Sequence, residues 1–262
     1  MRGQVIVITG ASSGIGAEMA VQFSKLGASV VLAARSQEKL DAVWRRLDRE
    51  QGQEHAAVEL DVTIAEQVEQ VFSGLIERYG SIDVLINNAG FAVFESCIDA
   101  PMEQFAAMMN VNYFGMVRCT KAVLPSMLQR GKGQIVNIAS IVGKIGSAKS
   151  TAYAASKHAV LGFANSLRLE LAGTGVAVTA INPGPVRTPF FDQADPHGHY
   201  VGNPRVQRFM LTADRVAHAV VEAVRHRREE VDLPFFAGFA ARLFHLFPRL
   251  YERAAGRLLK LK

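Results

Sequence analysis

Two side chains that could exchange a proton with a substrate lie four positions apart in the sequence, at Tyr153 and Lys157. The segment around them is predicted to be helical, and side chains four residues apart share one face of a helix. A phenol titrates near about 10 and exchanges protons poorly at neutral pH unless a fixed cation stabilises its phenolate. Lys157 is in position to be that cation. The same spacing also arises by chance, with a packed tyrosine beside a solvated lysine, so the surrounding chain must decide between the two interpretations.

A third reactive group, the hydroxyl of Ser140, ends an apolar strand predicted over residues 134–140. In α/β sheets ligands bind at the carboxyl ends of the strands, which is where this hydroxyl would lie. We therefore expect Ser140 to polarise a substrate oxygen.

A glycine-rich turn follows the first predicted strand, at about residues 4–9, and precedes a helical pattern that runs to about Leu26. Gly10, Gly14 and Gly16 would let the backbone turn sharply and approach a pyrophosphate at the positive end of the helix. Their spacing differs from the G-x-G-x-x-G fingerprint. A tight connection without a ligand is the alternative interpretation, but the succession of strand, turn and helix favours a nucleotide.

The second predicted strand, Ser29–Ala34, leads into Arg35 and Ser36. NAD-binding folds place an acidic residue at the end of this strand to bind a ribose hydroxyl. Here that place holds alanine, and Arg35 is available to pair with a 2′-phosphate, so NADP(H) is favoured over NAD(H). Ser36 could add a hydrogen bond. A solvated arginine at the start of a helix is the alternative.

Strands alternate with helices through the rest of the chain, which predicts a doubly wound parallel α/β sheet, a Rossmann fold, in a single domain. No internal repeat or linker interrupts the alternation. The further predicted helices cover about 37–51, a segment ending at about 79, and 101–129; the further strands end at about 62 and 86, with a last core strand at 176–182.

The composition is that of a soluble globular protein, with 49% hydrophobic and 20% charged residues among 262. Residues 1–3 lead directly into the first strand without a signal-peptide pattern, so a cytoplasmic location is expected. Cys97 and Cys119 have no metal-ligand spacing and are predicted to be free thiols. His197 and His199 are predicted to be solvated loop residues, and no metal site is expected.

The formal net charge of +5 is concentrated in residues 234–262, a basic amphipathic helical tail that follows the catalytic domain predicted for residues 1–233. The tail has six basic residues against Glu252, while the rest of the chain shows no basic stripe, so no nucleic-acid partner is predicted. Pro248 is expected to divide the tail into two short helices. Three interpretations stay open: packing on the protein's own body or a neighbouring subunit, peripheral contact with an anionic membrane surface, and a lid over the substrate pocket.

Taken in order, these stretches make the chain resemble the short-chain dehydrogenase/reductase family over residues 4–233. The family's cofactor turn matches residues 9–16, and its Asn-Asn-Ala-Gly stretch matches residues 87–90. Its catalytic asparagine precedes x-x-Gly, which selects Asn112 rather than Asn110. The residues that the resemblance and the strand ends assign to the cofactor are Gly10, Ser12, Ser13, Gly14, Ile15, Gly16, Arg35, Ser36, Asp61, Val62, Asn88, Ala89, Gly90, Tyr153, Lys157, Pro183, Gly184, Val186 and Thr188.

The resemblance implies hydride transfer between NADP(H) and a carbonyl carbon of a small-molecule substrate. Tyr153 would protonate the carbonyl oxygen, Ser140 would hydrogen-bond that oxygen, and Lys157 would hold the cofactor ribose. Asn112 would anchor a water molecule in the proton relay. The family is commonly dimeric or tetrameric, which implies a homodimer or homotetramer.

Two further positions acquire roles from the same resemblance. Asp61 would contact the adenine, and Thr188 would hold the carboxamide of the nicotinamide. The cofactor would thus extend from the end of the third predicted strand to the segment that follows the last predicted strand.

The substrate is expected to be covered by the least standard segment, residues 189–211. Aromatic side chains there and after residue 90 suggest an apolar carbonyl compound, although ordinary lid packing explains them nearly as well. An acyl-carrier-bound 3-ketone is the enzymatic alternative. A non-catalytic NADP-binding regulator, or a membrane-surface protein, is the alternative of a different class, but regulators of this kind usually lack the tyrosine or the lysine. The predicted pocket residues are Ser140, Phe91, Phe94, Phe190 and Phe191.

Overall fold

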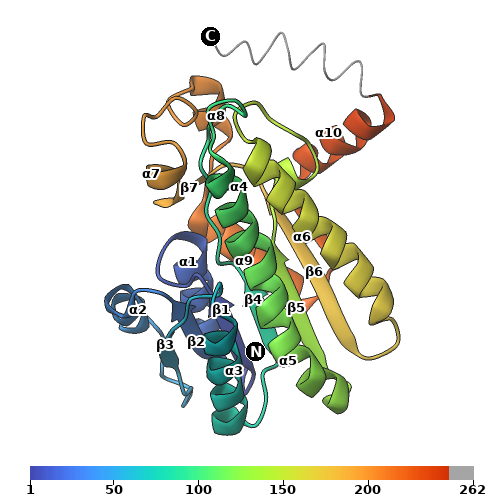
Figure 1. Ribbon diagram of the computed structural model, residues 1–262. Coiled ribbons are helices and arrows are strands. Elements are labelled where there is room, and N and C mark those ends of the chain that lie inside the picture. The colour runs from blue at the N-terminus through green and yellow to red at the C-terminus, as the bar shows by residue number, and fades with distance from the viewer. Residues whose placement is uncertain (248–262) are drawn as a thin grey trace.

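The computed structural model describes residues 1–247, apart from the side chain at position 245. Its centre is a parallel sheet of seven strands in the order β3-β2-β1-β4-β5-β6-β9 (Figure 1). The strands are short, and nearly every residue of the inner strands is buried, as expected for a sheet covered on both faces. They are β1 Val5–Thr9, β2 Ser29–Ala34, β3 Ala56–Glu59, β4 Val84–Asn87, β5 Gly133–Ile138, β6 Val176–Pro183 and β9 Glu230–Leu233.

Helices cover both faces of this sheet and create two separate cores. One core lies under α3, α5 and α6, where Phe72 and Met127 are fully buried. The other lies under α1, α2 and α9, with Phe23 and Leu40 at its centre. The predicted doubly wound α/β fold is therefore confirmed. The helices of these layers are α1 Gly14–Lys25, α2 Gln37–Trp44, α3 Ala65–Tyr79, α4 Met102–Met109, α5 Met116–Arg130, α6 Thr151–Glu170 and α9 Ala213–Arg225.

The prediction that residues 176–182 form the last core strand is wrong, because β9 pairs with β6 beyond it. The parallel register joins Ala180 to Glu230 and Pro183 to Leu233. The strand is hard to predict from the sequence because two of its four residues, Glu230 and Asp232, are acidic. In the structure Lys144 forms ion pairs with both Glu230 and Asp232, and so offsets part of their charge.

Two predicted helices also differ from the observed ones. The helix predicted to reach residue 51 ends at Trp44, where tighter backbone bonds, such as the one from the amide of Leu47 to the carbonyl of Trp44, replace the α-helical pattern. The helix predicted over 101–129 is divided into α4 and α5 by a π-helical stretch, Asn110–Gly115. Asn112 lies in the middle of that stretch.

The remaining elements lie beyond the carboxyl end of β6 (Figure 1). A second, two-stranded parallel sheet pairs β7 Val186–Arg187 with β8 Leu211–Thr212, and so brackets the segment predicted to be a lid. That segment contains the short helices α7 Phe190–Ala194 and α8 Pro204–Phe209. The described chain ends with α10 Phe235–Leu246. Within residues 1–247, no helix has the length and apolar character required to cross a bilayer.

Candidate active site

The glycine-rich turn between β1 and α1 has a backbone that side chains would disrupt. Gly10 and Gly14 have φ values of +64° and +56°, in the left-handed region that favours glycine. At Gly16 φ is ordinary, but an added Cβ would collide with the carbonyl oxygen of Gly10 and lie 2.7 Å from the side-chain Nδ2 of Asn88. Gly10 and Gly16 therefore allow this turn to pack closely against Asn88 and Ala89, which follow β4.

Asn88 braces the same turn from β4. Its side-chain Nδ2 donates to the carbonyl oxygens of Thr9 and Gly10, both at 3.0 Å. In return the backbone amides of Asn88 and Ala89 donate to the hydroxyl of Thr9 at 3.0 and 3.1 Å. The side-chain amide of Asn88, predicted to contact the cofactor, is thus already engaged in holding the glycine turn in place.

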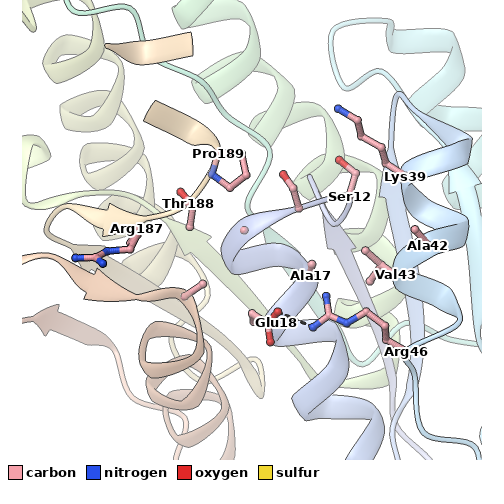
Figure 2. Close-up of a pocket in the computed structure, with 13 residues that line it drawn as sticks. Ser12, Ala17, Glu18, Lys39, Ala42, Val43, Arg46, Arg187, Thr188 and Pro189 are labelled. Carbon is pink, nitrogen blue, oxygen red and sulfur yellow. Dashed lines mark hydrogen bonds and ion pairs between the residues drawn. The ribbon is translucent and has the colours of Figure 1, made fainter. Parts of the chain in front are cut away.

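The N-terminus of α1 borders an open cavity of about 420 Å³, which Ser12, Ser13 and Gly14 help to line. Ser13 occupies the N-cap position, and its hydroxyl makes no capping bond. Uncapped N–H groups at the positive end of a helix favour an anion such as a phosphate. Figure 2 shows the residues that line this cavity: Ser12, Ser13, Gly14, Ala17, Glu18, Lys39, Ala42, Val43, Arg46, Arg187, Thr188, Pro189 and Ala213.

Lys39, at the start of α2, lines this cavity with its basic side chain, whereas Arg35 and Ser36, which were predicted to contact the cofactor, do not line it. Arg35 is exposed immediately after β2. The hydroxyl of Ser36 caps α2 by accepting a bond of 3.4 Å from the amide of Lys39. Sequence reasoning missed Lys39, although its place in the first turn of a helix that follows β2 was a usable signal. Arg46, also missed, is paired with Glu18 at 2.6 Å across the cavity wall.

Asp61 and Val62 follow β3 and are held by local contacts. One carboxylate oxygen of Asp61 accepts bonds from the amide and the hydroxyl of Thr63, at 2.9 and 2.7 Å. Val62 packs so closely against Gly115 that an added Cβ would approach its side chain to 2.5 Å. The end of β3 is thereby fixed against the π-helical stretch that carries Asn112.

Ser140, Tyr153 and Lys157 meet at the carboxyl ends of β5 and β6. Ser140 lies two residues after β5, and its hydroxyl contacts the carbonyl oxygen of Pro183, the last residue of β6, at 3.3 Å. Lys157 Nζ donates to the carbonyl oxygen of Ile138, the last residue of β5, at 2.8 Å. Tyr153 stands one helical turn earlier on α6, with its ring centroid 5.8 Å from that Nζ. All three residues are buried.

Burial shifts the acid–base properties of this group. It raises the pKa of the Tyr153 hydroxyl, and a hydrogen bond with Ser140 opposes only part of the rise. It lowers the pKa of Lys157 to about 8. The expected lowering of the tyrosine pKa by Lys157 is therefore not seen, because loss of hydration outweighs every favourable contact of the phenolate. The structure presents a neutral phenol at pH 7, which is a proton donor.

Asn112 clamps the chain after β4 to α6. Its Nδ2 donates to the carbonyl oxygen of Phe91 and to the hydroxyl of Ser156, at 2.9 and 3.0 Å, and its Oδ1 accepts from the amide of Phe91 at 2.9 Å. The hydroxyl of Ser156 in turn donates to the carbonyl oxygen of Tyr153 at 2.7 Å. The side chain of Asn112 thus connects the loop after β4 to the turn of helix that bears Tyr153. Gly90 lies in this corner, where an added Cβ would be 3.7 Å from Lys157 Nζ.

The segment after β6 joins the glycine turn to Ser140. The amide of Gly184 donates to the carbonyl oxygen of Leu233 at 2.6 Å, which ties the segment to β9. Thr188 stands opposite Gly14, where an added Cβ would lie 3.2 Å from it, and its hydroxyl donates to the carbonyl oxygen of Val186 at 3.4 Å. The structure therefore places the predicted nicotinamide-end residues between the helix N-terminus and the Ser140–Tyr153 pair.

Aromatic side chains surround the ring of Tyr153. Phe94 and Phe190 have ring centroids 6.2 and 5.8 Å from that of Tyr153. Phe191 contacts both phenylalanines, at 6.2 Å from Phe94 and 5.5 Å from Phe190. Phe91, which Asn112 holds through its backbone, packs against the same cluster. The four phenylalanines predicted for the substrate pocket thus lie together beside the phenol.

The lid segment is organised by Asp195, which sequence reasoning missed. This buried carboxylate accepts bonds from the backbone amides of His199, Tyr200 and Val201, at 3.0, 2.8 and 2.8 Å. The turn so formed presents the ring of Tyr200 to Phe94, at a centroid distance of 5.2 Å. The sequence gives no signal that singles it out, because Asp192 and several other polar residues lie in the same segment.

Comparison with known proteins gives consistent matches over most of the chain. A model of the family described as short chain dehydrogenase matches residues 4–198. The human protein named Dehydrogenase/reductase SDR family member 7 is 38% identical over 234 residues, which cover 87% of this chain and 69% of that protein. A variant of actinorhodin polyketide ketoreductase, solved with NADPH, is 36% identical with a TM-score of 0.76, covering 84% of this chain and 89% of its own. A short chain dehydrogenase/reductase from Burkholderia phymatum, solved in complex with NAD, is 28% identical with a TM-score of 0.85, covering 95% of each chain.

Proposed function

Because the chain belongs to the short-chain dehydrogenase family, we propose that it is an NADP(H)-dependent oxidoreductase that reduces an apolar carbonyl compound to an alcohol, or catalyses the reverse reaction. The observation that carries the proposal is the meeting of Ser140, Tyr153 and Lys157 at the carboxyl ends of β5 and β6. Ligands of doubly wound sheets bind at this edge.

The residues of the glycine turn fit a dinucleotide. The uncapped N–H groups at the start of α1 suit its pyrophosphate, and the missing side chains of Gly10 and Gly14 leave the backbone accessible. Thr188 lies against Gly14 of this turn and Val186 packs with Ile15, so both are close enough to hold the nicotinamide end. When bound, such a cofactor donates or accepts the hydride, which amino-acid side chains cannot do.

The chain's own residues would transfer the proton to or from the substrate oxygen. In reduction the neutral phenol of Tyr153 gives its proton to the carbonyl oxygen, while the Ser140 hydroxyl, already hydrogen-bonded to that phenol, orients the oxygen. Lys157 can carry a positive charge at neutral pH because its pKa is about 8. A cation at this place stabilises the phenolate left behind. Asn112 acts as a positioning residue through Phe91 and Ser156, and its part in a proton relay stays a prediction.

The choice of NADP(H) rests on charge. Ala34 offers no carboxylate at the end of β2, Arg35 is exposed next to it, and Lys39 lines the adjoining cavity. These groups favour a 2′-phosphate over a ribose hydroxyl. The related ketoreductase structure contains NADPH, whereas the Burkholderia structure contains NAD.

An apolar substrate is proposed from the aromatic cluster around Tyr153. The second candidate, an acyl-carrier-bound 3-ketone, is favoured by the likeness to a polyketide ketoreductase. A panel of free apolar ketones and 3-ketoacyl thioesters, followed by NADPH absorbance, would rank the two substrate classes. We also propose a homodimer or homotetramer, which light scattering would test, and a cytoplasmic location stays a prediction.

The assignment of the proton donor is tested by Tyr153→Phe, which removes one oxygen and retains the packed ring. Turnover should fall by at least about 100-fold, the scale of general acid catalysis, while the affinity for NADPH stays close to that of wild type. Tyr79→Phe is the matched control, because the Tyr79 hydroxyl donates to the backbone carbonyl of Glu54 at 3.2 Å, away from the site. Retention of most activity by Tyr153→Phe would refute the assignment, and no turnover of any carbonyl by wild type would favour a regulator.

A further inference from the structure

The helix α10 is apolar on two opposite faces. One face packs on the protein: Ala241 is 1% exposed, and an added Cβ at Gly238 would collide with the carboxylate of Asp232. A surface helix that buries one apolar face normally presents charged and polar residues on the other. In α10 the outer face carries only phenylalanine and leucine, with Arg242 at its border.

The outer face consists of Phe235, Phe236, Phe239, Leu243 and Leu246, which we call the α10 apolar face. At 3.6 residues per turn, these positions fall within about 100° of one another around the helix axis. Their exposed fractions are 82%, 49%, 61%, 42% and 71% in that order. Large contiguous apolar surface of this kind marks a binding site for a partner or a membrane.

The α10 apolar face continues onto the lid. The ring of Phe236 contacts that of Phe209, at the end of α8, with centroids 5.8 Å apart. Phe209 is itself 50% exposed. Both helices lie at the end of the molecule where the strands have their carboxyl ends (Figure 1). The combined surface is therefore larger than one helix face and adjoins the proposed active site.

Positive charge accompanies this surface. Arg242 on α10 and Arg208 beside Phe209 are both exposed. The sequence that follows α10, residues 248–262, adds five basic residues against Glu252. A partner that accepts both the phenylalanine side chains and this charge must combine an apolar layer with negative groups, as an anionic lipid surface does.

We propose that the α10 apolar face and Phe209 dock on an anionic lipid surface. The helix would lie in the interface plane, since its 12 residues span about 18 Å, well short of the roughly 30 Å hydrocarbon core. A second copy of the chain fits less well. A two-fold interface through this face would gather Arg242 and Arg208 of both copies, four like charges, in one contact region without a described acidic partner on that face.

Co-sedimentation of the full-length protein with vesicles tests the proposal. We expect binding to vesicles of phosphatidylcholine mixed with phosphatidylserine, little binding to phosphatidylcholine alone, and weaker binding at high salt. The triple variant Phe235→Ser, Phe239→Ser, Leu246→Ser should reduce binding at least roughly tenfold, because membrane affinity scales with buried apolar area. Vesicle binding is measured without substrate or cofactor, so the result is independent of the proposed reaction.

Ile98→Ser combined with Leu169→Ser is the matched control, because it removes apolar side chains that are 92% and 79% exposed elsewhere. The control should bind vesicles like wild type, and thermal melting should show that both variants are folded. Undiminished binding of the triple variant, or no binding of wild type to anionic vesicles, would overturn the proposal. A wild-type oligomer that the triple variant loses, without vesicle binding by either, would assign the face to a second copy instead.

Discussion

Replacing Lys157 with methionine should change how the stability of this protein depends on pH. Lys157 is 5% exposed, and burial lowers its pKa from the usual 10.5 to about 8. Below pH 8 the folded and unfolded chains both carry the proton, and the folded chain bears the full cost of the buried charge. Between pH 8 and 10.5 the unfolded chain binds more protons, so wild type becomes more stable as the pH rises.

The size of the effect follows from the two pKa values. At 1.36 kcal/mol per pKa unit, the full gain is roughly 3 kcal/mol, of which about 1 to 2 kcal/mol falls between pH 7 and 9.5. Methionine has a similar length and no charge, so Lys157→Met removes this gain. The bond to the carbonyl of Ile138 is also lost, and its dependence on the charge of Lys157 is already contained in the folded-state pKa. The raised pKa of Tyr153 acts in the opposite direction, but only above about pH 10.

Urea unfolding of wild type and Lys157→Met at several pH values from 7 to 9.5 would measure the effect. The free energy of unfolding of wild type relative to the variant should rise with pH. Lys121→Met, which replaces an exposed lysine on α5, is the control and should show no such trend. A difference between wild type and Lys157→Met that stays flat or falls as the pH rises would show that the buried amine is not destabilised as argued.

Three further predictions follow from the site. Arg35→Ala should reduce the preference for NADPH over NADH by about 1 to 2 kcal/mol in binding free energy, measured by calorimetry. If the variant discriminates between the two cofactors as well as wild type does, the phosphate is recognised elsewhere. Gly16→Ala forces the added carbon against the backbone of Gly10, so unfolding free energy should fall by about 1 to 3 kcal/mol and dinucleotide affinity should drop as well. Asp195→Ala removes the acceptor of three backbone hydrogen bonds in the lid, so the free energy of unfolding should fall by about 2 kcal/mol. The same variant should raise KM more than it lowers kcat, and an unchanged KM would show that the lid does not contact the substrate.

The parts of the site that the sequence predicts are those set by local geometry. The strand, turn and helix around Gly10 follow from contiguous residues, and the pairing of Tyr153 with Lys157 follows from helical spacing. Ser140 was predictable because an apolar strand delivers it to the sheet edge. In each case the residues that determine the position lie within a few places of one another along the chain.

The parts that the sequence does not predict depend on distant partners. Lys144 and Asp232 are 88 residues apart, and neither shows alone that β9 joins the sheet. The engagement of Asn88 with Thr9 spans 79 residues, so its bracing role could not be separated from a contact with ribose. The rise of the Tyr153 pKa could not be predicted either, because Phe94 from the loop after β4 and Phe190 from the lid come together around Tyr153 only in the folded protein. Pro248 and the helix boundary predicted there lie outside the described residues.

The place of β9 in the sheet has a consequence for the chain during its synthesis. The first six strands of the sheet emerge from the ribosome before residues 230–233, so β6 is for a time an edge strand with unpaired backbone groups. Lys144, whose carboxylate partners both belong to β9, is then an unneutralised cation beside this edge. Arg168 stands there as well, since its guanidinium reaches the carbonyl oxygens of Val178 and Glu229 in the finished fold. Charged side chains at an open edge discourage pairing with a foreign strand, so we expect the two residues that later secure β9 to disfavour such pairing until β9 is made.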